Sequence, residues 1–418
     1  MLSWEFPPVV VGGIARHVQD LSLALTRQGL EVTVLTAGPG EAPPVEKLGG
    51  LIIHRVRSEN PRPLDLVGEV MQLNLNMLQR ALGLAAGGRR FTLVHAHDWV
   101  TAYAAKALKH GLDLPLFATV HATEWGRNNG LHNDLQRYIS DVEWWLSYEA
   151  WRVICCSHYM REELRRIFQV PEDKLRLIPN GVYPEEFAAP PAPPGFRERY
   201  AAPDERIVFH VGRLVREKGL DVLLEAFARV LARFPRAKLV VAGRGPHEPA
   251  LHEHARRLGI YGRVYFTGYI DDASRNLLYH LADAVVFPSL YEPFGIVALE
   301  AMAAGAPLLV SDTGGLGEIV VHGRNGLKAR TGDPVSFAEN LLWMLEHPER
   351  TSGMRDQARE DVRILYDWGG IAARTRTAYE EVLAERARMR LEGAEAARSF
   401  PVPAGDGERP ERYREAIG

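Results

Sequence analysis

The feature that most constrains the fold is an alternation of short apolar runs with amphipathic helical stretches. In the first half of the chain the candidate strands are Leu30–Thr36, Leu51–Arg57, Phe91–Ala96, Leu116–Val120 and Arg152–Cys156. Helical patterns lie between them, such as Ile14–Gln28 before Gly29 and Thr101–His110 before Gly111, and each glycine is expected to take the left-handed conformation of a helix cap. Strands that are apolar along most of their length predict a parallel sheet covered by helices on both faces.

A proline-rich segment divides the chain. Residues Ala188–Pro194 read AAPPAPP, which fits neither a helix nor a central strand. The alternation then resumes, with candidate strands at Ile207–Val211, Lys238–Ala242, Val264–Thr267, Ala284–Phe287 and Pro307–Val310. Helices are predicted over Asp221–Phe234 and from Asp333–Pro334. We therefore predict an α/β fold of two Rossmann-like, doubly wound parallel-sheet domains, with ligands bound in the cleft between them.

The predicted organisation has five parts. Residues 1–187 and 204–366 form the two domains, and residues 188–203 form the spacer. Residues 367–391 have a long helical pattern, and residues 392–418, rich in charge, glycine and proline, are predicted to be poorly ordered.

Composition excludes several classes of protein. Hydrophobic residues make up 46% and charged residues 25%, as in ordinary globular chains, and a net charge of −3 gives no global basic field for nucleic acid. No apolar run approaches the ~20 residues of a membrane span. Residues 1–8 lack the pattern of a signal peptide, so a cytoplasmic location is expected. Cys155 and Cys156 are adjacent, which predicts two buried thiols rather than a disulfide.

In this fold the chemistry is expected on loops that follow strands. Gly12 and Gly13, in the loop before the first helix, allow backbone to approach an anion closely, although a tight turn without a ligand explains them equally well. Arg213 and Lys218, in His210–Gly219, form a pair of cations that can neutralise a diphosphate. Taken alone, two solvated surface cations are the commoner case.

A third loop, Tyr291–Gly305, combines a carboxylate with a helix start. Glu292 precedes proline and is held extended, and the amides from Gly295 onward are free to bind phosphate or sugar oxygens. Glu300 lies one to two turns inside the helix among small apolar residues, so a buried carboxylate with a partner is favoured over an exposed glutamate.

Two histidine-containing loops, HAHDW from His95 and HATEWGR from His121, follow strands of the first half. Asp98 and His121 are predicted to face the cleft, while the alternative for any single histidine is a structural role.

Other chemistries are not indicated. Gly243-Arg244-Gly245 lacks the third glycine of a dinucleotide fingerprint, and no Walker A sequence or G-x-S-x-G elbow occurs. No DxD triplet is present, so no metal site is predicted.

Taken together, the loops resemble the retaining GT-B glycosyltransferases, the family that includes glycogen, starch and sucrose synthases, from Trp4 to about Leu383. The strongest match is EPFG from Glu292 with Glu300, the family's E-x7-E motif. GRLVREKG from Gly212, IPNGV from Ile178 and TGGL from Thr313 also match in order.

The resemblance implies a role for each matched residue. Arg213 and Lys218 would bind the donor diphosphate, Glu292 would contact the transferred sugar, and Glu300 would hold the ribose. Tyr269 would stack on the base, and the His121 carbonyl would face the anomeric centre. The implied catalytic residues are His121, Arg213, Lys218 and Glu292. The implied donor-binding residues are Gly12, Gly13, Asp98, Asn180, Gly212, Tyr269, Phe294, Gly295, Ile296, Val297 and Glu300.

Within the family, HATEWGRNNG and DVEWWLSYEAWRVICCSHYM look most like bacterial glycogen synthase and maltose-1-phosphate synthase. The implied reaction moves glucose from ADP-glucose (or UDP-glucose) to an α-glucan or glucose 1-phosphate, without cofactor, nucleic acid or membrane. The alternatives are another hexose donor, or a non-catalytic nucleotide-sugar-binding protein. Trp144, Trp145, Tyr148 and Trp151 are compatible with a sugar platform, but their helical spacing favours core packing.

The chain departs from the family pattern twice. The first strand, at Leu2–Trp4, is shorter than is usual in the family, so a less stable strand is expected there. Val10 and Val11 stand where a basic residue often precedes the glycines, so phosphate contact from this side is expected through backbone.

Overall fold

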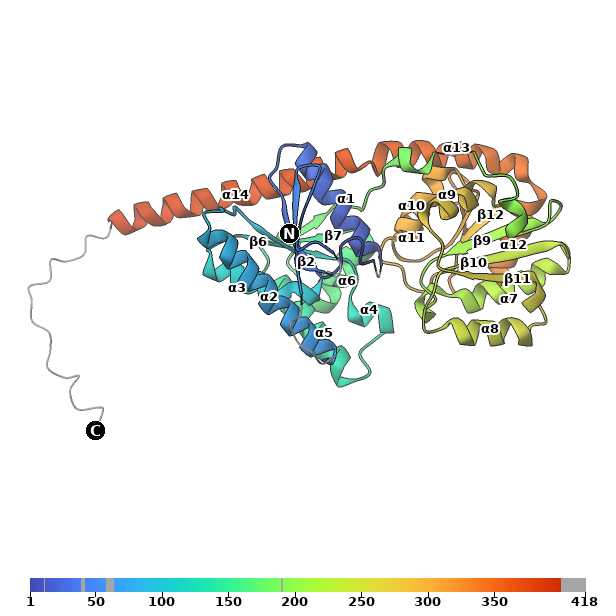
Figure 1. Ribbon diagram of the computed structural model, residues 1–418, viewed down its shortest axis with the longest axis horizontal. Helices are drawn as coiled ribbons and strands as arrows, with labels where there is room; N and C mark the ends of the chain where they lie inside the picture. The colour runs from blue at the N-terminus through green and yellow to red at the C-terminus, as the bar shows by residue number, and fades with distance from the viewer. Residues whose placement is uncertain (11, 39–41, 58–63, 189–190, 400–418) are drawn as a thin grey trace, which may run out of the picture.

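The computed structural model describes residues 1–10, 12–38, 42–57, 64–188 and 191–399. The two halves of the chain form separate α/β units side by side, and a long C-terminal helix crosses back over the first (Figure 1). Val11, part of the proline-rich spacer (189–190) and the end of the predicted tail (400–418) lie outside the described residues.

The first unit is built on an eight-stranded sheet in the order β3-β4-β2-β1-β5-β6-β7-β8, parallel except for the antiparallel β3–β4 pair. Its strands are β1 Leu2–Ser3, β2 Thr33–Ala37, β3 Val45–Leu48, β4 Leu51–Val56, β5 Val94–His97, β6 Leu116–Val120, β7 Arg152–Cys155 and β8 Leu175–Leu177. Although short, β1 keeps the central position between β2 and β5, and the Met1 amino group donates to the Thr33 carbonyl at 2.7 Å.

The second unit is built on a six-stranded, wholly parallel sheet in the order β11-β10-β9-β12-β13-β14. Its strands are β9 Arg206–Val211, β10 Ala237–Ala242, β11 Val264–Gly268, β12 Ala284–Phe287, β13 Leu308–Ser311 and β14 Leu327–Ala329. Two sheets of this kind, with helices packed on them, confirm the predicted pair of Rossmann-like domains.

The helices fill the connections between strands. In the first unit they are α1 Gly13–Arg27, α2 Leu66–Ala86, α3 Ala102–Gly111, α4 Glu124–Asn128, α5 Asp134–Glu149 and α6 His158–Phe168. In the second they are α7 Leu220–Leu231, α8 Glu248–Arg257, α9 Asp272–Leu281, α10 Ile296–Ala304, α11 Gly314–Ile319, α12 Pro334–Glu346 and α13 Pro348–Leu365, and α14 runs over Trp368–Ser399. None of the helices in the described ranges is long and apolar enough to cross a membrane.

One local prediction is wrong. Gly29 does take the predicted left-handed conformation (φ 86°), but Gly111 remains the last residue of α3, and Asp113 takes the positive φ of 49°. Helix α14 continues through residues 392–399, because the run EGAEAARS is rich in helix-favouring alanine, glutamate and arginine.

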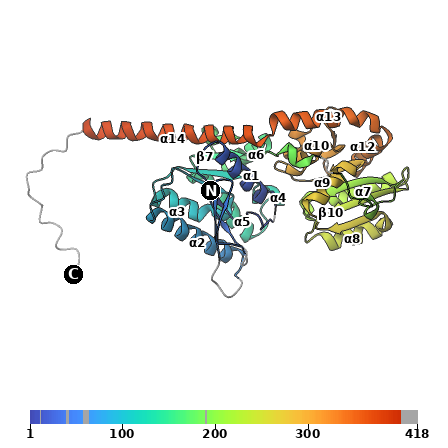
Figure 2. The same cartoon turned by 45° about the horizontal axis from the view of Figure 1, so that its top comes forward.

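Helix α14 ties the end of the chain to the first domain (Figures 1 and 2). Trp368, Tyr379 and Val382 are almost fully buried against α1, in a core that also contains Leu25. The Tyr379 hydroxyl lies 2.6 Å from His95 Nδ1 at the centre of the sheet. The second unit is therefore connected to the first at both ends, by the spacer before it and by α14 after it.

A second connection lies where Tyr291 of the second domain enters the first. The Tyr291 hydroxyl donates to Glu163 Oε1 at 2.9 Å, and the same oxygen accepts from the Thr123 hydroxyl at 2.5 Å. Nearby, the Ser157 hydroxyl donates to the Pro293 carbonyl at 2.6 Å. We call Thr123, Gly126, Glu163 and Tyr291 the Tyr291 junction; each of these residues is buried.

The junction leaves no space beside Gly126. A Cβ on this residue would lie 2.5 Å from both Tyr291 Cε2 and its hydroxyl oxygen. We expect Gly126→Ala to lower the free energy of unfolding by about 1–3 kcal/mol, since the ring must be displaced. Gly83→Ala is the matched control, because Gly83 is an exposed helical glycine with nothing within 4 Å of its added Cβ. Urea unfolding of both variants measures the difference, and equal midpoints would contradict the close packing.

Candidate active site

The loops that follow β9 and β12 meet at a partly buried ion pair. Lys218 Nζ donates to Glu292 Oε2 at 2.6 Å, and the Ser289 hydroxyl contacts the same oxygen at 3.3 Å. Gly219 makes this meeting possible, because a Cβ there would lie 2.1 Å from the Pro288 carbonyl oxygen. Its φ of 67° also suits glycine. The two motifs predicted to share one site are thus joined directly.

The TGGL loop supports the same backbone from the other side. The Gly315 amide donates to the Glu292 carbonyl at 2.9 Å. A Cβ on Gly314 would lie 2.0 Å from that carbonyl oxygen, and one on Gly315 would lie 2.4 Å from Phe294 Cα. These two glycines therefore allow the loop to pack directly on the Glu292–Phe294 backbone.

Two helix N-termini from different domains approach each other beside this loop. Helix α10 begins at Ile296 after Gly295 (φ 106°), and α1 begins at Gly13 after Gly12; neither has a side-chain cap. A Cβ on Gly13 would lie 3.2 Å from Ile296 Cδ1. Uncapped N-terminal amides attract anions, so both sides offer donors to a phosphate. The Gly12 amide donates to Glu5 Oε2 at 2.9 Å.

Glu300 is buried with a partner, as predicted. Its Oε2 accepts from the Tyr279 hydroxyl at 3.0 Å and lies 3.5 Å from Arg275 Nε. Burial raises the pKa of Glu300 above its usual value, although the positive charge of Arg275 opposes the shift. A carboxylate held in this way accepts hydrogen bonds from a fixed position.

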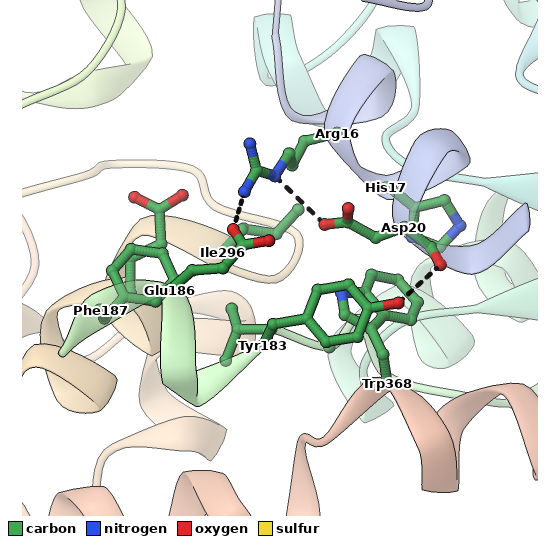
Figure 3. Close-up of a pocket in the computed structure, with 11 residues that line it drawn as sticks. Arg16, His17, Asp20, Tyr183, Glu186, Phe187, Ile296 and Trp368 are labelled. Atoms are coloured by element: carbon green, nitrogen blue, oxygen red, sulfur yellow. Dashed lines mark hydrogen bonds and ion pairs between the residues drawn. The ribbon is translucent and has the colours of Figure 1, made fainter. Parts of the chain in front are cut away.

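Glu300 also lines a pocket between the domains, with Ile296 from α10, Arg16 and Asp20 from α1, and Glu186 (Figure 3). The Arg16 guanidinium contacts Glu186, Asp20 (3.2 Å) and Asp272 (3.5 Å). Burial raises the pKa of Asp20 to about 7 despite this cation. The pocket therefore has acidic groups on both sides of one arginine.

Asp98 and His121 lie together at the ends of β5 and β6. Asp98, at a strained φ of 58°, accepts the His121 backbone amide at 2.7 Å through Oδ1. His121 Nε2 lies 3.1 Å from His97 Nδ1. Burial lowers the pKa of His121 to about 3, so its imidazole is neutral at physiological pH. Asn180 is also buried, and its Oδ1 has no hydrogen-bond partner in the described part of the chain.

The structure does not bring all the predicted residues together. The Arg213 guanidinium is exposed and contacts Glu217 at 3.4 Å, while Lys218 pairs with Glu292; the two cations were expected to converge. The short 3-10 helix at Arg216–Lys218 separates them.

The other predicted residues lie on their loops. Tyr269 is 73% exposed. Gly212, whose amide donates to the Ala242 carbonyl, and Val297, in the first turn of α10, lie in the predicted loops.

Several neighbours of the site were not predicted. His17 and His97 pack against His121, and Tyr291 and Glu163 connect the two loops, yet none was singled out. His97 lies in the quoted HAHDW sequence, two residues before Trp99, so its position was a usable signal. Of the four aromatic residues with helical spacing, Trp145 packs against Tyr103, but Trp144 and Tyr148 are exposed and stack on each other, so core packing is wrong for that pair.

Asp98 gives the site a pH dependence that can be measured as stability. Burial raises its pKa from 3.8 to about 6, so the folded chain binds a proton more tightly than the unfolded chain. That contribution to stability is present below about pH 4 and is lost as pH rises to 6. Asp98→Asn has no such carboxyl group and should not lose this stability. As pH rises from about 4 to 6, the free energy of unfolding of the variant should therefore increase relative to that of the wild type, by at most ~1.4 kcal/mol per pH unit. Urea unfolding at several pH values measures the difference; a constant difference would contradict the shift.

Known glycosyltransferases are similar to this chain over most of its length. The family models described as "Glycosyl transferases group 1" and "Glycosyltransferase Family 4" match residues 195–361 and 11–186. An uncharacterized glycosyltransferase of Methanocaldococcus jannaschii is 37% identical, over 91% of this chain and 97% of that protein. A glycogen synthase of Mycobacterium tuberculosis is 35% identical, over 91% and 93%. The sucrose-phosphate synthase structure from Thermosynechococcus elongatus superposes with a TM-score of 0.80 at 25% identity, over 92% and 98%. The chain therefore belongs to the group 1 glycosyltransferases of the GT-B fold.

Proposed function

We propose that the chain is a retaining glucosyltransferase that takes glucose from a nucleoside-diphosphate glucose, with ADP-glucose favoured over UDP-glucose. The observation that carries the proposal is the Lys218–Glu292 pair, placed beside the uncapped start of α10. The similarity to a glycogen synthase supports an α-glucan acceptor, with glucose 1-phosphate as the alternative. The free, buried thiols of Cys155 and Cys156 suit a reducing cytoplasm.

The charges of the transition state explain this arrangement. Breaking the bond between sugar and diphosphate leaves negative charge on phosphate and positive character on the sugar ring. Lys218, Arg213 and the amides of Phe294, Gly295 and Ile296 would stabilise the phosphate. The Glu292 carboxylate and the His121 carbonyl would face the sugar. Cations and helix amides of the chain then supply the charge that a metal supplies in other transferases.

Other buried groups would set the orientation of the donor. Glu300 would accept from the ribose hydroxyls, because Tyr279 holds its carboxylate in place. Asn180 would bind a hydroxyl of the sugar through its unpartnered Oδ1, and Asp98 would position the His121 backbone. Tyr269, exposed on the loop after β11, would stack on the base. Gly12 and Gly13 would approach the phosphates through backbone.

Lys218 is the residue whose removal tests catalysis most directly. We expect Lys218→Met to lower turnover by ~10²–10³-fold, since a cation aimed at the leaving phosphate is lost. Lys238→Met is the matched control, because its amine donates to the Gly262 carbonyl in the same domain and turnover should be unchanged. Release of nucleoside diphosphate measures turnover, and circular dichroism checks folding. Equal turnover in a folded Lys218→Met variant would contradict the proposed role.

Donor, acceptor and stereochemistry are tested together. ADP-glucose and UDP-glucose are each supplied with glycogen, maltose and glucose 1-phosphate, and released diphosphate is measured. We expect the fastest reaction with ADP-glucose and a product whose new linkage is α by proton NMR. A preference for UDP-glucose would reassign the donor, and a β-linkage would overturn retention. Absence of turnover with every pair would overturn glucosyl transfer to these acceptors.

A further inference from the structure

Three histidines from separate elements of the first domain meet beside the proposed sugar site. His17 lies on α1, His97 ends β5, and His121 follows β6. One ring nitrogen of each lies within 4.8 Å of the others. We call these three residues the histidine cluster. The topology explains it, because β5 and β6 are parallel neighbours whose carboxyl ends lie at the same edge of the sheet.

The rings of the cluster are close enough to share a ligand. His97 Nδ1 lies 3.1 Å from His121 Nε2, and the ring of His17 stands edge-on to that of His121 with centroids 4.6 Å apart. Three nitrogens bound tetrahedrally at about 2.0–2.1 Å from one zinc ion are roughly 3.3–3.4 Å apart. The His97–His121 pair already has nearly this spacing. The larger separations, up to 4.8 Å, would have to shorten when the ion binds.

Several ring nitrogens of the cluster have no partner within the described chain. Neither ring nitrogen of His17 has a hydrogen bond of good geometry, and the same holds for His97 Nε2, whereas His97 Nδ1 faces His121 Nε2. His17 and His97 are 4% and 0% exposed, so they are among the most buried polar residues of the protein. Buried polar atoms without a partner are rare and call for a ligand, an ion or an ordered water.

The cluster consists of imidazoles alone, so each of its side chains offers a nitrogen ligand. A set of imidazoles suits zinc and similar transition ions, whereas magnesium and calcium prefer oxygen ligands.

We propose that His17, His97 and His121 bind one zinc-type transition ion, and that this ion excludes the donor sugar. Three histidines leave the fourth position of a tetrahedral ion to solvent. The second part of the proposal rests on the proposed function, which places His121 beside the sugar. An ion on the His121 imidazole would crowd the transferred ring, because the carbonyl of the same residue faces that ring, so it inhibits the enzyme rather than assisting it.

Binding is tested without any enzyme assay. The full chain is freed of metal with a chelator and then titrated with Zn²⁺ in competition with a chromogenic indicator. We expect one Zn²⁺ per chain, and at least tenfold weaker binding in both His17→Gln and His97→Gln. His54→Gln is the matched control, because His54 is a buried histidine of the same sheet that contacts Arg80 instead. Its affinity for Zn²⁺ should be unchanged.

The outcomes of this titration separate the possibilities. No stoichiometric binding to the wild-type chain would overturn the site. Binding that survives in folded His17→Gln and His97→Gln chains would place the ion elsewhere and would also overturn it. Co²⁺ supplies a second readout, since its visible absorption distinguishes a four-coordinate nitrogen site from octahedral binding at the surface. An octahedral spectrum in the wild-type chain would contradict the site.

Inhibition is tested separately. Zn²⁺ should raise the apparent KM for the nucleotide sugar without lowering turnover at saturating donor, and His17→Gln should lose this sensitivity relative to its own metal-free rate. Tight Zn²⁺ binding without inhibition would contradict competition between the ion and the donor sugar, but it would not contradict the metal site. Failure of the glucosyltransferase proposal would remove only this second measurement, because the titration needs no substrate.

Discussion

The contact on which the arrangement of the two domains depends is the Tyr291 junction. The phenol of Tyr291 crosses from the second domain into the first and shares the buried carboxylate of Glu163 with Thr123. Tyr291 is adjacent to Glu292, and Thr123 is two residues after His121. The same hydrogen bonds that join the domains therefore also set the position of the Glu292 loop relative to the His121 loop. A buried carboxylate needs both donors, so neither loop can withdraw without leaving it poorly satisfied.

Close backbone approach is the second constraint, and it explains the glycines of the loops around the Lys218–Glu292 pair. Gly219 passes against the Pro288 carbonyl, and Gly314 and Gly315 pass against the Glu292 and Phe294 backbone. No side chain fits at these distances, so three motifs that are far apart in sequence form one packed layer under the Lys218–Glu292 pair. The acidic and basic groups are thus positioned by backbone that has little freedom to move.

Much of this was predictable from sequence, because apolar periodicity and loop motifs are local signals. The strands Leu116–Val120 and Ala284–Phe287 were predicted at their observed bounds, since each is a fully buried run between polar turns. Short edge strands such as Val45–Leu48 were missed, because two charged residues interrupt the sequence VEKL and leave no apolar run. Glu300 was predicted to be buried from its small neighbours alone, and the structure supplies the partner, Tyr279.

What sequence did not reveal depends on distance in space. The contacts of Tyr291 with Glu163, and of His17 with His121, join residues more than one hundred positions apart, and no local pattern encodes such a pairing. Arg213 was expected beside Lys218 because five residues of loop can bring two cations together. A 3-10 helix at Arg216–Lys218 and the acidic Glu217 keep them apart instead. The motif identified the residues, while their geometry came from packing.

The two domains present different charges to the site, and burial sets the charges on the first domain. On the first domain, His17, His97 and His121 are kept neutral, and the raised pKa of Asp98, about 6, reflects the cost of a charge there. On the second domain, the Lys218 ammonium and the amides at the start of α10 supply positive charge. A neutral, polar wall suits the hydroxyls of a sugar, and a wall that offers an ammonium group and free helix amides suits a diphosphate. A nucleotide sugar carries both chemistries in one molecule, so it complements both sides at once.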